Sequence, residues 1–158
     1  MKKENIFKLV IAIVVSEGIG LIGGLATSAG VSGWYLTLAK PALNPPNWIF
    51  GPVWTLLYIL MGVAAFFIWQ RGLGDRKVRK SLIVYGVQLL LNLLWSIVFF
   101  GLHSPLWALV VIIFLWLFIL LTIVEFYKQR PLAAYLLIPY ILCVSFASYL
   151  NYMLWFLN

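Results

Sequence analysis

Five long apolar runs alternate with short polar segments along the chain. A hydrocarbon core about 30 Å thick needs about 20 residues of α-helix, so each run is long enough to span a bilayer. The pattern predicts an all-α membrane protein, a bundle of five transmembrane helices that forms a single domain over residues 1–158. The predicted spans are residues 6–27, 48–69, 81–101, 106–126 and 132–156.

The connections between these spans are short turns, with one exception. Residues 72–75, 103–105 and 128–131 carry Gly or Pro at positions typical of turns and helix starts. The first connection, residues 28–47, is much longer and contains large aromatic side chains. Long loops of this kind are typical of functional lids, so we expect this loop to cover a site.

The composition indicates the same class of protein. Of the 158 residues, 65% are hydrophobic and 9% are charged, and the mean hydropathy is +1.06. Such a chain has too little polar surface for a soluble domain. The formal net charge of +7 could indicate a nucleic-acid partner, but the basic residues lie between apolar spans. We therefore expect membrane lipid around the chain and no nucleic acid.

The basic residues also predict an orientation. With five spans, ten of the 11 Lys and Arg residues fall on one side and Lys40 alone falls on the other. Basic loops stay in the cytoplasm, so we expect a cytoplasmic N-terminus and an outside C-terminus. An alternative is a cleavable signal peptide over residues 1–28, because Lys2 and Lys3 precede the first apolar run. The length of that run and Glu17 in its middle argue against cleavage.

Two rare residue types limit the possible chemistry. Cys143 is the only cysteine, so the chain forms neither an intrachain disulfide nor a multi-cysteine metal site. His103 is the only histidine, which argues against a histidine-ligated metal site and a His-based catalytic triad. We therefore predict no metal site and no required cofactor.

Polar residues inside the spans indicate where a site would lie. Gln88, Asn92 and Ser96 recur at helical spacing in the third span, beside Trp95. This face should point at protein and away from lipid, either to bond another helix or to bind a ligand. Glu17 lies in the middle of the first span, where an ionised acid without a partner costs at least about 2.5 kcal/mol. It should therefore either form a structural hydrogen bond or have a functional role.

Three spans place complementary side chains at matching heights in the outer half of the membrane. The heights follow from the span ends and a helical rise of about 1.5 Å per residue. Aromatic, amide and small side chains at one depth, below the long loop, suit a flat and apolar aromatic ligand. The lower level holds Tyr58, Asn92 and Cys143, and the upper level holds Trp54, Trp95 and Ala147.

The same segments resemble a known family. Residues 40–58 read KPALNPPNWIFGPVWTLLY, residues 92–100 read NLLWSIVFF, and residues 137–151 read LIPYILCVSFASYLN. These stretches resemble the signatures of the TspO/MBR family, the tryptophan-rich sensory and translocator proteins. Together with five spans and a long first loop, the resemblance covers nearly the whole chain.

The resemblance implies a five-helix bundle, usually a homodimer, that binds tetrapyrroles such as protoporphyrin IX. It also implies binding of synthetic ligands of the benzodiazepine and isoquinoline carboxamide type, and some members are associated with light-dependent porphyrin breakdown. Trp34 and Tyr35 would belong to the lid. The implied ligand-binding residues, with Cys143 added from its height, are Tyr35, Pro45, Trp54, Tyr58, Asn92, Trp95, Phe99, Cys143, Phe146, Ala147 and Asn151.

The sequence departs from the family pattern at two points. Cys143 stands where the fifth-span motif usually has Trp, so one aromatic wall of the implied pocket is missing. No basic residue follows Tyr152, whereas mammalian members carry an aromatic-basic pattern there that is associated with cholesterol. The second departure argues against a dedicated steroid function and favours a bacterial cell membrane.

Three functions remain to be compared. The leading hypothesis is a membrane receptor or sensor that binds tetrapyrroles in an outer-half pocket between the helices. The alternative is an enzyme that degrades porphyrin in light, in which Trp54 and Trp95 would donate electrons. A porphyrin or lipid transporter ranks third: Pro52 is expected to kink the second span, and no repeated half contains a matching kinked span.

Overall fold

The computed structural model describes residues 3–158, so Lys2 lies outside the described residues. Within this range the chain is helical and forms no strand. Five helical segments are long and apolar enough to cross a membrane, which confirms the predicted five-helix membrane bundle. These segments are Lys3–Ser28, Asn47–Trp69, Arg76–Gly101, Pro105–Gln129 and Pro131–Leu157.

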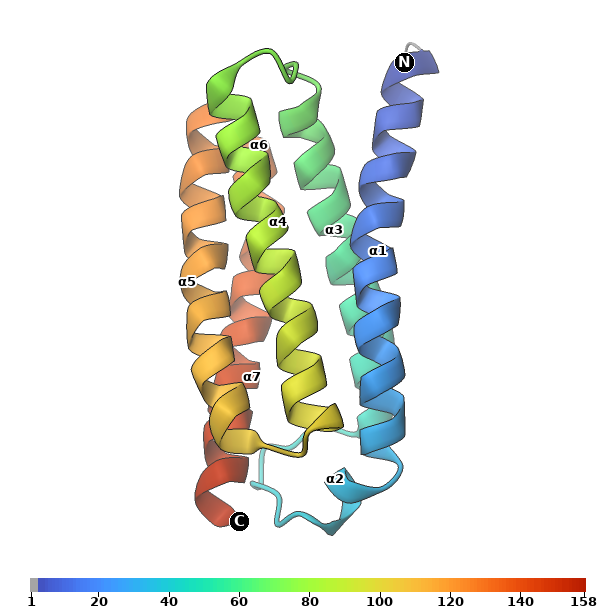
Figure 1. The fold of residues 1–158 in the computed structure, drawn as a ribbon, viewed down its shortest axis with the longest axis vertical. Coiled ribbons are helices and arrows are strands. Elements are labelled where there is room, and N and C mark those ends of the chain that lie inside the picture. Colours follow the sequence, from blue (N-terminus) through green and yellow to red (C-terminus); the bar gives the residue numbers. More distant parts are fainter. Residues whose placement is uncertain (1–2) are drawn as a thin grey trace.

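The chain runs up and down the bundle and leaves its two ends at opposite ends of the molecule (Figure 1). The end that carries the turns at 70–75 and 130 is called the basic end, and the opposite end, with residues 31–47, the loop end. The elements are α1 (Lys3–Val31), α2 (Trp34–Thr37), the 3-10 turn η1 (Asn47–Ile49), α3 (Phe50–Trp69), α4 (Arg76–Ser96), the π-helical η2 (Ile97–Gly101), α5 (Pro105–Gln129), α6 (Pro131–Tyr135) and α7 (Ile138–Leu157).

Local sequence explains where the helices begin. The carboxylate of Asp75 accepts a hydrogen bond from the backbone N–H of Lys77 at 2.8 Å and so caps the start of α4. The preceding turn needs Gly72, whose φ of 99° is a left-handed conformation that side chains rarely adopt. Pro105 and Pro131 occupy the first turns of α5 and α6, where a missing N–H costs nothing.

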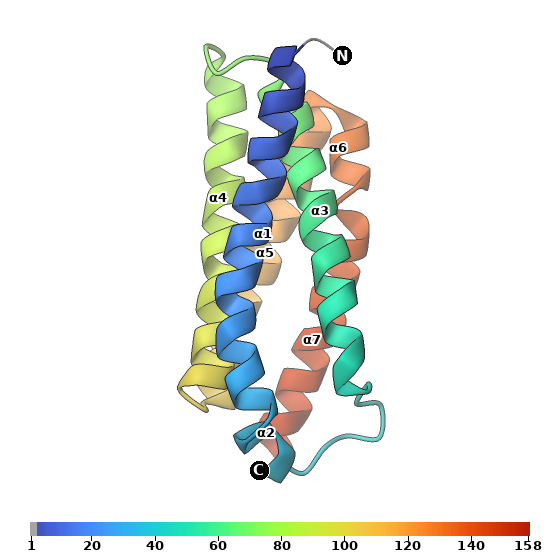
Figure 2. The same cartoon turned by 90° about the vertical axis from the view of Figure 1, so that its right-hand side faces the viewer.

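The fifth span differs from the single helix expected over residues 132–156. It consists of α6 and α7, separated by a turn at residues 136–137, and the two helices follow one another along the same side of the bundle (Figure 2). Pro139 lies in the first turn of α7 and has no N–H to donate to the carbonyl of Tyr135. A continuous helix is therefore interrupted here.

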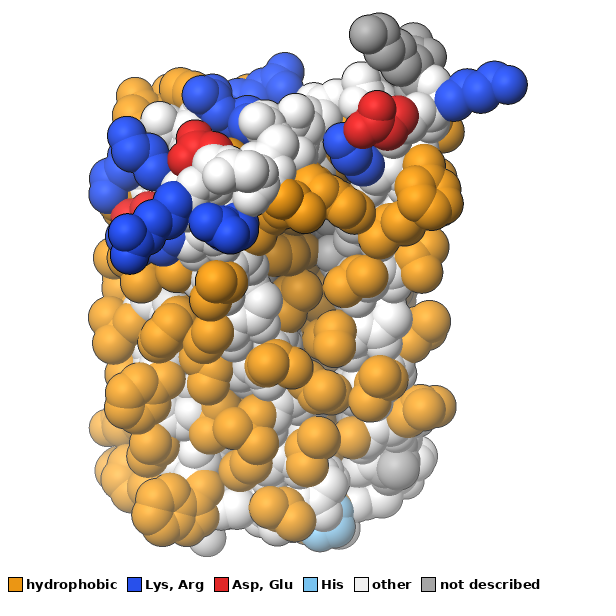
Figure 3. All heavy atoms as spheres, turned by 45° about the horizontal axis from the view of Figure 1, so that its top comes forward, with side chains coloured by type: hydrophobic (Ala, Val, Ile, Leu, Met, Phe, Trp, Pro, Cys, Tyr) orange, Lys and Arg blue, Asp and Glu red, His pale blue; other side chains and the backbone are white. Residues whose placement is uncertain are grey.

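The helices pack by close backbone approach on one side and by large side chains on the other. Gly62 of α3 lies against α1, and a Cβ at this position would stand 2.7 Å from the Cα of Ile13. Between α3, α4, α5 and α7 the interior is filled by Met61, Phe126 and Tyr140, which are fully buried. The outward faces remain apolar and are covered with hydrophobic side chains (Figure 3), as expected of a surface that lipid solvates.

Candidate functional site

A chain of buried hydrogen bonds joins α3, α4 and α7 near the middle of the bundle. The hydroxyl of Tyr58 donates to Oδ1 of Asn92 at 2.7 Å, and Nδ2 of Asn92 donates to the hydroxyl of Tyr140 at 2.8 Å. The hydroxyl of Tyr140 donates in turn to Oε1 of Gln88 at 2.8 Å. The polar face of α4 therefore binds neighbouring helices, and it holds the two tyrosines at fixed positions.

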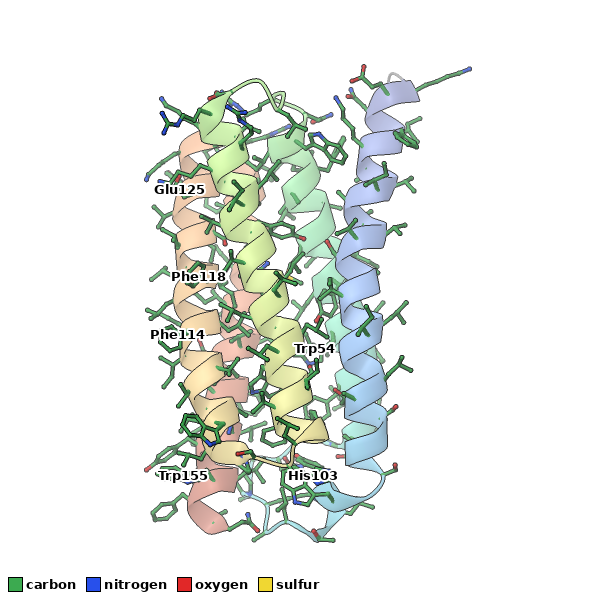
Figure 4. All side chains as sticks on the ribbon, in the orientation of Figure 1. Trp54, His103, Phe114, Phe118, Glu125 and Trp155 are labelled. Carbon is green, nitrogen blue, oxygen red and sulfur yellow. The ribbon has the colours of Figure 1, made fainter. Side chains whose placement is uncertain are left out.

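Trp54 borders this network on the side of the loop end. Its ring centroid lies 6.0 Å from that of Tyr58 and 6.3 Å from that of Tyr140. Figure 4 places Trp54 in the half of the bundle that also contains His103, away from Glu125 at the basic end. Trp54 is only half-buried, so part of this residue is not covered by the protein.

Trp95 forms a second aromatic element on α4, closer to the loop end. Its ring stacks on Phe99 with centroids 5.5 Å apart, and its Nε1 donates to Oδ1 of Asn151 at 3.0 Å. Nδ2 of Asn151 donates to the carbonyl of Pro105 at 2.7 Å. This arrangement ties α4, α7 and the start of α5 together, and it fixes the orientation of the indole.

Tyr35 anchors the first loop to the end of the bundle. Its side chain is buried, its ring packs on Phe99 and Phe100, and its hydroxyl donates to Oδ1 of Asn44 at 2.6 Å. The ammonium of Lys40 lies over the ring, 4.9 Å from the centroid. Burial raises the pKa of the Tyr35 hydroxyl above its usual value, and the bond to Asn44 partly offsets this rise. The hydroxyl thus remains a donor at neutral pH.

Two further contacts hold the loop down. Trp34 stacks on His103, with ring centroids 4.7 Å apart, and meets Phe99 edge to face at 5.6 Å. The side chain of Asn158 accepts from the N–H of Ala39 at 2.9 Å and donates to the Ala39 carbonyl at 3.1 Å. The loop is therefore folded against the bundle, as a lid requires.

The remaining predicted residues are less tightly grouped. Cys143 and Ala147 are half-buried on α7 and pack against the core. Pro45 is half-buried in the loop, and its carbonyl accepts from the side chain of Asn44 at 3.2 Å. Phe146 is 42% exposed and stacks on Tyr149, so it faces outward on α7. Ring contacts and hydrogen bonds in the described part of the chain join Trp54, Tyr58 and Asn92 in one group and Trp95, Phe99 and Asn151 in another, and Phe146 belongs to neither group.

Tyr140 is the central residue that the sequence analysis missed. Although no part of it is exposed, its hydroxyl contacts both amides of α4. A signal was present, because a tyrosine inside a membrane span needs a partner for its hydroxyl. For Glu17, the sequence leaves two alternatives open, and its Oε1 is buried without a hydrogen-bond partner among the described residues. The structural bond considered for Glu17 is therefore not seen at this oxygen.

These features define a polytopic membrane protein with an aromatic and amide-lined centre beneath a folded loop. The chain belongs to the TspO/MBR family, whose model matches residues 11–156, and this confirms the resemblance noted in its motifs. Membership supports a sensor or receptor role in a membrane.

Relatives in several organisms match most of the chain. It is 43% identical over 155 residues to the Tryptophan-rich protein TspO of Chlorobaculum tepidum, which covers 98% of both chains. It is 44% identical over 155 residues to the protein of the same name from Archaeoglobus fulgidus, covering 98% of this chain and 99% of the relative. The Translocator protein of Sus scrofa is 39% identical over 140 residues, covering 85% and 82% respectively.

Proposed function

We propose that this protein is a membrane receptor or sensor for flat, apolar aromatic ligands, with tetrapyrroles of the protoporphyrin IX type as its main ligands. The ligand would lie in the loop-end half of the bundle, between α3, α4 and α7 and under the lid. Synthetic ligands of the benzodiazepine and isoquinoline type would share this site.

One observation carries the proposal: Trp54 is half-buried beside a rigid polar network. A buried tyrosine pair and Asn92 hold the floor of the site in place, whereas the indole of Trp54 still has uncovered surface. On α7, Cys143 and Ala147 pack against the same core cluster as Trp54, and their small side chains leave more room than an aromatic residue would. A planar ligand would gain from stacking on this indole beside the polar network.

The names of two relatives agree with this function. A relative from Cereibacter sphaeroides, 39% identical over 120 residues, is named Tryptophan-rich sensory protein, and a human relative, 40% identical over 123 residues, is named Translocator protein.

We further propose a homodimer in a bacterial cell membrane, with the basic end cytoplasmic. The distribution of charge supports this orientation, because Lys40 is the single Lys or Arg of the loop end within residues 3–158.

Titration with protoporphyrin IX in the dark tests the proposal. Trp54→Ala should weaken binding about two- to tenfold, because one aromatic stacking contact contributes about 0.5–1.5 kcal/mol. Trp107→Ala is the matched control, since Trp107 is 66% exposed on the lipid face of α5. Saturable binding with the same affinity in the parent protein and in both variants would refute the site.

The same titration under illumination separates receptor from enzyme. If porphyrin is degraded in light, the indole of Trp54 would donate an electron to the photoexcited porphyrin, and the ring of Tyr58 lies beside that indole with centroids 6.0 Å apart. Light-dependent loss of porphyrin with a defined product, abolished in Trp54→Phe, would favour porphyrin breakdown. Stable bound spectra in light and dark would support the receptor.

A further inference from the structure

A cavity lies at the basic end, the opposite end of the bundle from the lid that covers the proposed ligand site. It has a volume of about 520 Å³ and is enclosed by the α3–α4 turn, the first turns of α4 and the end of α5. Figure 3 shows the Lys and Arg side chains gathered at this end. The lining contains four basic and two acidic side chains, which leaves a net charge of +2.

A buried carboxylate holds two of the lining ammonium groups in place. Glu125 is 7% exposed, and its Oε1 accepts from Nζ of Lys80 at 3.2 Å and from Nζ of Lys128 at 2.9 Å. Figure 4 shows Glu125 at this end of α5. Each ammonium has three N–H donors and uses one of them here, so two donors on each remain for another acceptor.

The other two cations are not neutralised by ion pairs. Nη1 of Arg71 donates to the carbonyl of Gln129 at 2.5 Å, which fixes the guanidinium between the α3–α4 turn and α5 and leaves most of its five donors open. Asp75 is the acid nearest to Arg71 and Lys77 in the sequence, but its carboxylate accepts the hydrogen bond that caps α4. Within residues 3–158, neither Arg71 nor Lys77 forms an ion pair with a carboxylate.

We propose that this cavity binds a phosphate group. Phosphate offers several acceptor oxygens to donors that converge from different elements, and guanidinium and ammonium groups are its usual partners in proteins. The cavity also lies beside the N-terminus of α4, a 21-residue helix whose dipole favours an anion there. A phospholipid headgroup and a soluble phosphorylated molecule would supply the same chemistry.

A solvated ring of basic residues is the competing explanation, because membrane proteins collect such residues on one side. The chain offers a matched control for it. Arg76 and Arg79 belong to the same end but do not line the cavity. The pair Arg71→Gln with Lys77→Gln removes two charges from the cavity, whereas Arg76→Gln with Arg79→Gln removes two charges from its surroundings.

The test uses the purified full chain, freed of lipid in a neutral detergent. Binding of dioleoylphosphatidylglycerol is counted by native mass spectrometry, with dioleoylglycerol as the lipid that lacks phosphate, and inorganic phosphate is titrated by thermal unfolding. The cavity pair should weaken binding about tenfold or more, because hydrogen bonds to charged groups contribute about 1.5–3 kcal/mol. The control pair should change it about twofold or less, because exposed and distant charges are screened.

The two arms identify the source of the phosphate. Retention of the phospholipid alone assigns a headgroup, whereas saturable stabilisation by inorganic phosphate assigns a soluble ligand. Equal losses in both double variants would overturn the proposal, as would the absence of binding in both arms. If the double variant of the cavity does not fold, Lys77→Gln alone provides the same comparison with Arg76→Gln, because the side chain of Lys77 is exposed.

Discussion

Asn92→Ala should lower the free energy of unfolding of the bundle, and this loss should overlap with the loss caused by Tyr58→Phe. The substitution removes the acceptor of the Tyr58 hydroxyl and the donor to Tyr140, all within a buried region. Tyr140 keeps its bond to Gln88, but the hydroxyl of Tyr58 loses the one partner seen for it among the described residues. Tyr58→Phe removes the same hydroxyl directly and leaves its ring in place against Trp54.

The size of the effect follows from these bonds. Hydrogen bonds between membrane helices contribute about 0.6 kcal/mol on average and up to about 1.7 kcal/mol. Two bonds from Asn92 therefore correspond to a loss of about 1–3 kcal/mol, and the single bond of Tyr58 to a loss of about 0.6–1.7 kcal/mol. In the double variant the Tyr58–Asn92 bond is lost once, so the free energy of unfolding should fall by less than the sum, with a coupling of about 0.5 kcal/mol or more.

Reversible unfolding in mixed micelles measures these free energies. Tyr85→Phe is the control, because Tyr85 bonds to Ser16 of α1 and lies two helical turns from Asn92. Asn92→Ala and Tyr85→Phe should be additive to within about 0.5 kcal/mol. Additivity of Asn92→Ala with Tyr58→Phe would refute the inferred bond. A loss of dark porphyrin affinity without a loss of stability would instead make Asn92 a ligand contact.

Three further predictions concern the site wall, the lid and the orientation. Cys143→Trp should change porphyrin affinity or photoreaction rate while the protein stays folded, and unchanged values for both would remove Cys143 from the pocket. Asn158→Ala removes both bonds to Ala39 and should raise the rate of proteolysis in residues 38–47 about five- to 150-fold, since each such bond contributes about 0.5–1.5 kcal/mol. An unchanged rate would show that Asn158 does not fasten the lid. In a Cys143→Ser background, cysteines at Lys40 and Arg76 should be labelled from opposite sides of the membrane, and labelling from one side would contradict five spans.

Much of the fold could be read from the sequence because bilayer thickness fixes the length of an apolar run. The rotation of each helix was harder to predict. A helix that faces lipid is apolar on its outer side as well as its inner side, so the sequence shows little contrast between them. Phe146 illustrates this: its motif placed it in the site, but the structure turns it outward.

The candidate site was predictable where polar groups had to be satisfied inside the membrane. Asn92 was identified because a buried amide needs partners, and the structure supplies Tyr58 and Tyr140. The inward position of Tyr140 was harder to predict, because Tyr140 follows the turn at residues 136–137, and no hydrophobic pattern indicates that turn. A proline in the run, Pro139, was the available signal for that turn.

Tyr58 connects the site to the outermost packing of the bundle. Its ring lies directly against Gly20 of α1, where a Cβ would stand 2.5 Å from two ring atoms. The same side chain bonds to Asn92 and borders Trp54, so α1, α3 and α4 meet at this residue. A ligand that stacks on Trp54, as proposed, would therefore contact a ring whose neighbour, Tyr58, also packs against α1. Under the proposed function, α1 is then the helix through which an occupied site would be felt at the lipid surface, because the outer face of α1 is exposed.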